Sequence, residues 1–192
     1  MNSINKTLTN WLNNLDKFSY KNYEELPDID LYMDQMVTFL EKQLTIFQTS
    51  TLDKQITPSM INNYVKGEVI TAPISKKYNR EHIALIEEVC TLKQVLSIAE
   101  VKQVIDERYK KQDKDKQIIF NNFKDTVNNK NHEAINFVNN QLKEIDNNDL
   151  NELTNLAVEL ACTANAYITI AKRILFLNKL HQDQLENEKK QD

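Results

Sequence analysis

Residues 57–83 read TPSMINNYVKGEVITAPISKKYNREHI, and the rest of the fold can be predicted outward from them. Thr57 followed by Pro58 is typical of a helix start, because threonine caps free N–H groups and proline has no N–H to lose there. We expect a short helix over 58–66 that ends near Gly67, where a left-handed residue is favoured. The β-branched, proline-broken and basic stretch at 69–78 then predicts an extended hairpin or wing.

Helical patterns lie on both sides of this stretch. Apolar residues recur there at three- and four-residue steps, which is the spacing of one helix face. These stripes cover residues 4–18, 29–47, 83–96, 98–105, 118–142 and 153–177. The sequence therefore predicts a chain of helices with one short β element.

Helix starts can be assigned from capping residues. Asp28 or Asp30 can cap the helix that begins near residue 29. Asn79 caps the helix after the hairpin, and Ser97 with Glu100 three residues later forms a capping box.

Glycine content supports a helical fold. The chain has 192 residues but 1 glycine and 3 prolines. Barrels, sandwiches and doubly wound sheets need turn glycines, so we expect a mainly α protein. The same count excludes a glycine-rich phosphate loop.

Positive charge is concentrated around the short helix. Residues 54–80 carry five cations against Glu68 alone, although the whole chain has a formal net charge of -4 and each flank is acidic. A local basic block is what a nucleic-acid surface needs in an acidic protein. The alternative is an ordinary solvated surface.

The order of helix, loop, short polar helix, basic hairpin and two further helices predicts a winged helix-turn-helix that reads DNA in the major groove. Asparagine can read adenine, and lysine and serine can reach phosphates. Tyr64 can instead be a core aromatic residue. The candidate DNA-binding residues are Thr57, Ser59, Asn62, Asn63, Tyr64, Lys66, Lys76, Lys77, Tyr78 and Arg80.

Three segments carry a resemblance to known families. Residues 57–64, 76–83 and 92–98 resemble the DNA-binding half of MerR-like regulators. When residues 26–35 are included, the four segments resemble more closely a bacterial family called domain of unknown function 1836. The resemblance covers about residues 5–108 and implies a MerR-like winged helix-turn-helix in a transcriptional regulator. The sequence departs from the pattern at Asn62-Asn63, where MerR-like proteins have an Arg-Tyr pair, and at Glu68, where the family has glycine.

The C-terminal region beyond the charged seam at 110–116 predicts two long helices. Asp149 can cap the second, and its polar tail is expected to fray from Gln182. Its apolar face is too wide for a surface helix, so we expect it to be covered on two sides. The cover is either the preceding helix of the same chain or a second copy. We predict residues 1–110 as the DNA-binding domain and 111–192 as a helical hairpin or dimerisation region.

Other site classes find little support. Cys90 and Cys162 lie in apolar helical patterns and are expected to be buried thiols in a reducing cytosol. The three histidines are far apart, so we expect no metal site and no cofactor. No nucleophile–base pair or catalytic motif is found, so we expect no enzyme.

We also expect a cytoplasmic protein without a membrane segment. The start of the chain does not read as a secretory signal. Its longest uncharged run on the C-terminal helix, residues 160–171, is shorter than the ~20 residues that a bilayer needs.

The sequence as a whole predicts a dimeric, sequence-specific transcriptional regulator that binds double-stranded DNA, with a possible unknown effector. The alternative is a helical protein-interaction adaptor whose helix-turn-helix no longer binds DNA.

Overall fold

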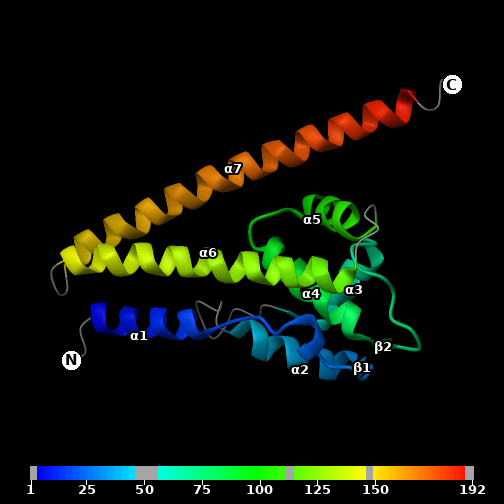
Figure 1. Cartoon of the computed structure of the whole chain (residues 1–192), viewed down its shortest axis with the longest axis horizontal. Helices are drawn as coiled ribbons and strands as arrows, with labels where there is room; N and C mark the ends of the chain where they lie inside the picture. Colours follow the sequence, from blue (N-terminus) through cyan, green and yellow to red (C-terminus); the bar gives the residue numbers. More distant parts are fainter. Residues whose placement is uncertain (1–3, 46–55, 111–114, 146–148, 189–192) are drawn as a thin grey trace.

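The chain is mainly helical, as its glycine content predicts (Figure 1). The structure is a computed structural model that describes residues 4–45, 56–110, 115–145 and 149–188. The helices are α1 (Ile4–Lys17), η1 (Tyr23–Glu25), α2 (Met33–Leu44), α3 (Pro58–Lys66), α4 (Arg80–Lys93), α5 (Ile98–Ile105), η3 (Asp106–Lys110), α6 (Lys116–Glu144) and α7 (Leu150–Glu188). Two strands, β1 (Leu31–Tyr32) and β2 (Lys77–Tyr78), pair antiparallel.

The start of α2 differs from the prediction. Neither Asp28 nor Asp30 caps it; the N-cap is Tyr32, whose N–H donates to Oε1 of Gln35 at 3.0 Å. The helix α2 begins later in the chain than predicted because β2 holds Leu31 and Tyr32 in an extended conformation. Pairing between strands so distant in sequence has no local signal.

A single large core surrounds α4. Met36 and Leu40 of α2, Ile61 of α3 and Ile83 of α4 have no exposed surface. Phe120 from α6 is equally buried in the same cluster. The first turns of α6 therefore complete the core of the preceding helices. Residues 111–114 lie outside the described residues, and the domain division at 110/111 stays a prediction.

An ion pair between a partly exposed arginine and a buried carboxylate joins α4 to η3. The Glu88 side chain is 0% exposed, and Oε1 lies 2.9 Å from Nε of Arg108. The Tyr109 hydroxyl donates to Oε2 of Glu88 at 2.8 Å, and Arg108 also donates to the carbonyl of Ile119 at 3.0 Å. Burial raises the pKa of Glu88, and Arg108 and the hydrogen bond from Tyr109 act in the opposite direction. The pair of Glu88 and Arg108 thus connects α4, η3 and α6.

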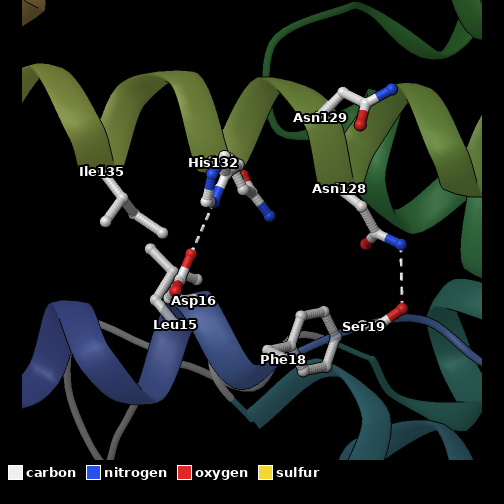
Figure 2. Close-up of a pocket in the computed structure, with 9 residues that line it drawn as sticks. Leu15, Asp16, Phe18, Ser19, Asn128, Asn129, His132 and Ile135 are labelled. Atoms are coloured by element: carbon white, nitrogen blue, oxygen red, sulfur yellow. Dashed lines mark hydrogen bonds and ion pairs between the residues drawn. The ribbon is translucent and has the colours of Figure 1, made fainter.

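Polar pairs hold α1 along α6 (Figure 2). Nδ1 of His132 lies 2.8 Å from Oδ1 of Asp16, and Asn128 donates to Oγ of Ser19 at 2.8 Å. The hollow between them has a volume of about 290 Å³, and its polar groups point at each other across it. This arrangement fixes the position of α1, and Leu12 is buried in a second, smaller cluster with Ile135.

Within one chain most of α7 is exposed, so α6 covers little of its apolar face, and cover by a second copy stays a prediction. Leu156 is its one buried residue among the side chains that the structure describes. Gln103 of α5 donates to the carbonyl of Leu175 at 2.7 Å, so the second half of α7 leans on α5. The helix also continues to Glu188 instead of fraying from Gln182, because Gln182 bonds to Glu107 of η3.

The two cysteines differ, and the prediction for one of them is wrong. Cys90 is buried in α4, where desolvation raises the pKa of its thiol to about 12. Cys162 is exposed, since α7 has little cover at that point.

By length and composition alone, α7 could cross a membrane over Leu150–Leu185. The most apolar stretch of this helix is not buried inside the protein. One such helix is weak support for a membrane span, since the core helices of soluble proteins can have the same length and hydropathy. The segment also carries charges: Glu152, Glu159, Lys172, Arg173, Lys179 and Asp183.

Candidate nucleic-acid interface

The start of α3 is capped as the sequence predicts. The Met60 N–H donates to Oγ1 of Thr57 at 3.2 Å, and Pro58 occupies the first helical position. Ile61 and Tyr64 are buried and set the side of α3 that packs on the core. The opposite side is thereby turned outward at a fixed angle.

Replacing Thr57 with alanine is expected to lower the free energy of unfolding by about 1 kcal/mol, because an N-cap hydrogen bond is lost. Thr57→Ser keeps the hydroxyl and should retain most of the stability. Urea denaturation measures both. Equal stability of the alanine and serine variants would contradict the capping role.

The outward side of α3 carries four of the predicted DNA-binding residues. Ser59, Asn62, Asn63 and Lys66 are all exposed. Tyr64 is not among them: it is buried in the core, where desolvation raises the pKa of its phenol to about 12. The ring packs as a core aromatic residue and is not part of the outward side of α3.

The left-handed residue at the end of α3 is Glu68 instead of Gly67. Gly67 has φ -80° and its N–H still donates to the carbonyl of Asn63 at 2.9 Å, so the helical turn runs through the glycine. Glu68 then takes φ 56°. Lys102 of α5 donates to the carbonyl of Gly67 at 3.1 Å and to Oε2 of Glu68 at 3.0 Å. This ion pair also offsets the one acid of the basic block.

The predicted hairpin is confirmed only at its tip. Ile74 and Lys77 exchange two backbone hydrogen bonds of 3.1 and 2.9 Å around Ser75 and Lys76. Both loop residues have positive φ, 51° and 64°. Two-residue hairpin loops take this conformation because it matches strand twist, although it strains residues other than glycine and asparagine. Lys76 is thus held at an exposed tip.

The stretch before the hairpin is packed, not extended into solvent. Val69 and Ile70 are buried beside α3 and α4. His82, only 4% exposed, has Nε2 at 3.2 Å from Oγ1 of Thr71 and 3.3 Å from the carbonyl of Ala72. These contacts fix the loop on the first turn of α4 and so position the tip.

The other predicted residues of the hairpin region have structural contacts. Lys77 lies over the ring of Tyr32, with Nζ 5.3 Å from its centroid. Tyr78 is buried, and burial raises its pKa. Nε of Arg80 donates to the carbonyl of Leu26 at 3.1 Å. Lys76 is therefore the predicted cation with the freest access to a partner on this hairpin.

The structure brings α3 and the hairpin to one end of the molecule, away from the start of α1 (Figure 1). Lys54, the fifth cation of the basic block, lies outside the described residues. Lys102 lies beside this basic block, and the sequence did not predict its position there. It comes from α5, more than thirty residues further along, and no local pattern marks its position.

The comparisons with known proteins give one match. The family model described as "Domain of unknown function (DUF1836)" matches residues 21–127. Searches of curated proteins and of solved structures found no match. The matched range includes α2 to α5, the hairpin and the part of α6 that completes the core. The chain therefore belongs to the DUF1836 family.

Proposed function

We propose that the protein is a sequence-specific DNA-binding transcriptional regulator of the cytoplasm. The observation that carries the proposal is the pairing of an exposed polar face on α3 with a lysine-tipped hairpin at the same end of the molecule. From the element order β1, α2, α3, hairpin, α4, α5 we infer a MerR-like winged helix-turn-helix. In this arrangement α3 enters the major groove and the hairpin follows the backbone.

The contacts divide into two classes. Asn62 and Asn63 present amides that can bond base edges, and adenine is the base that an amide matches in two bonds. Lys66 and Lys76 supply charge for phosphates.

In vitro selection from random duplex DNA, read at two salt concentrations, tests the proposal. We expect enrichment of one sequence motif, with binding that weakens as salt rises. No enrichment, together with no salt-dependent binding, would overturn it.

Lys76→Asn is expected to weaken binding to all sequences alike and to lower the salt slope by about one, because one phosphate contact is lost. Asparagine tolerates the left-handed backbone, so the hairpin keeps its shape. Lys143→Gln is the matched control, since that lysine lies exposed in the last turn of α6. A loss of affinity equal in both variants would contradict a specific role for the tip.

Asn62→Ala is expected to relax sequence preference by about 1–3 kcal/mol at one base position. Alanine favours helix more than asparagine does, so helix loss cannot explain the result. Selection with the variant protein measures it. Uniform weakening on every sequence would instead assign Asn62 to the backbone.

A second candidate function has a specific observation in its favour. The long exposed apolar side of α7 fits a helical adaptor that binds other proteins. A partner that remains bound after nuclease treatment, in a protein that selects no DNA sequence, would favour this function over the first.

A further inference from the structure

The hollow between α1 and α6 lies between the two apolar clusters of the protein. Phe18 at this hollow packs against the large core around α4, and Leu15 and Ile135 belong to the smaller cluster. The polar residues that line the hollow are Asp16, Ser19, Asn128, Asn129, Asn131 and His132 (Figure 2). Polar groups thus occupy a position where apolar packing is the ordinary way to join two helices.

Two amide atoms at this hollow are buried without a partner. Oδ1 of Asn128 and Nδ2 of Asn131 have almost no exposed surface, and neither makes a hydrogen bond to any of the described residues. Asn128 donates from Nδ2 to Oγ of Ser19, and its oxygen points towards the hollow (Figure 2). An unpaired buried donor or acceptor costs free energy, so both atoms need a partner from outside the protein.

The charge of the lining favours a neutral ligand. Asp16 is the one acid, and no lysine or arginine lines the hollow among the residues that the structure describes. Nδ1 of His132 lies 2.8 Å from Oδ1 of Asp16, so the imidazole is already engaged with that carboxylate. A phosphate or a carboxylate would meet the acid with no lysine or arginine to balance it. A single carboxylate is also a poor donor set for a calcium or magnesium ion.

The pattern of hydrogen-bonding groups matches hydroxyls. A hydroxyl both donates and accepts, so a ligand with several hydroxyls can donate to Oδ1 of Asn128 and accept from Nδ2 of Asn131. A carboxylate accepts several bonds, and Asp16 therefore keeps capacity beyond its bond with His132. Figure 2 shows Asp16 with His132 on one side of the hollow and Asn128 with Ser19 on the other. A sugar ring presents hydroxyls on all sides, whereas a flat nucleobase presents its donors and acceptors along its edges.

The apolar side chains and the volume favour the same ligand. Leu15, Phe18 and Ile135 give the hollow an apolar part, which the C–H surface of a sugar ring can cover. Ligand pockets typically measure about 300–1,000 Å³. The hollow, at about 290 Å³, therefore suits a molecule with one ring.

We propose that the hollow between α1 and α6 binds a neutral monosaccharide. Asn128, Asn131 and Asp16 bond its hydroxyl groups, and the apolar side chains cover its C–H surface. The lining residues lie within 15–19 and 128–135. Both segments fall outside residues 21–127, which the family model matches, so the site lies beyond the matched region.

The site connects α1 to α6. Because its residues come from both helices, a ligand binds while α1 lies along α6, and it stabilises that arrangement. The backbone amides of α1 should therefore exchange their hydrogens more slowly when the sugar is bound. A sugar that acts only as a stabilising solute, through exclusion from the protein surface, would slow exchange in every helix and not in α1 above all.

Titration of the full chain with D-glucose, D-galactose, D-mannose and D-ribose tests the site, followed by the NMR signals of the side-chain amides. We expect at least one sugar to bind with a dissociation constant of about 1 mM or lower, in keeping with a ligand of about twelve non-hydrogen atoms. The amide signals of Asn128 and Asn131, identified by their loss in the alanine variants, should shift. The phosphate ester of the same sugar should bind at least about 10-fold more weakly, because Asp16 repels it.

Alanine variants locate the site. Asn128→Ala and Asn131→Ala should each weaken binding about 10-fold, because one hydrogen bond to the sugar is lost. Asn122→Ala is the matched control, since it makes the same change at an exposed position of α6 that does not line the hollow. Alanine favours helix more than asparagine does at all three positions, so unfolding cannot explain a loss of binding.

Three outcomes would overturn the inference. The first is that none of the four sugars binds below about 10 mM, in which case water alone satisfies the two amides. The second is equal binding by the Asn128→Ala and Asn122→Ala variants. The third is a phosphate ester that binds as tightly as its sugar. These titrations use no DNA, so neither their success nor their failure bears on the proposed regulator.

Discussion

Replacing Arg108 with methionine is expected to lower the free energy of unfolding by about 3–5 kcal/mol, the cost of leaving a buried carboxylate without its charge partner. Glu88 has no exposed surface and relies on Arg108 and the Tyr109 hydroxyl. The arginine also donates to the carbonyl of Ile119, so the substitution loosens η3 and the start of α6 together. Urea denaturation at neutral pH measures the loss.

A double-mutant cycle separates charge from packing. Glu88→Gln combined with Arg108→Met removes both charges, and this double variant should be more stable than Arg108→Met alone. Lys130→Met, which breaks an exposed pair with Glu133, is the control and should leave stability unchanged. If the double variant is no more stable than the single one, the loss comes from packing and the charge argument is wrong.

The sequence predicts the helices well where their signals are local. Thr57, Asn79, Ser97 and Asp149 all cap the helices that they were expected to start. Each of these caps depends on a side chain and an N–H two or three residues away. Such short-range geometry is written into adjacent residues, which is why composition and spacing suffice.

Predictions failed where a distant segment decides the local structure. The N-cap of α2 is Tyr32 and not Asp28 or Asp30, because β2, more than forty residues later in the chain, holds β1 in an extended conformation. Val69 and Ile70 look like a strand by composition, yet they are buried against helices, and His82 fixes the loop beyond them. β-propensity describes a half-buried surface, and it does not say which element provides the cover.

The candidate interface was predictable in its residue types but not in their exposure. The sequence placed Tyr64 and Tyr78 beside the asparagines and lysines, and burial separates them into core and surface. Lys102 joins the block only because α5 packs beside the end of α3. Likewise, the width of the apolar face on α7 was visible in the sequence, while its exposure in one chain required the structure.

Replacing Glu87 with glutamine is expected to stabilise the protein by about 3 kcal/mol at neutral pH and to remove a pH dependence. Glu87 is 1% exposed, and neither of its carboxylate oxygens has a hydrogen-bond partner among the described residues. Burial raises the pKa of Glu87 to about 8, only partly opposed by Lys21. Folding therefore forces this carboxyl to take up a proton, or to be buried charged, at neutral pH.

The direction of the pH effect follows from proton binding. A carboxyl whose pKa is higher in the folded state binds the proton more tightly there, so the wild-type protein is most stable below the ordinary pKa of glutamate. Its stability then falls as the pH rises, until the folded-state value near 8 is passed. From about pH 5 to about pH 7 the loss is about 3 kcal/mol, at 1.36 kcal/mol for each pH unit.

Urea denaturation of wild type and Glu87→Gln across this range measures the effect. The two curves should lie close together in acid and diverge as the pH rises, because glutamine binds no proton in either state. Glu133→Gln is the matched control, since that side chain is 64% exposed on α6 and should leave the slope unchanged. If wild type and Glu87→Gln lose stability in parallel between about pH 5 and about pH 8, the carboxyl is ionised in the folded protein, and a cation or donor must lie against it.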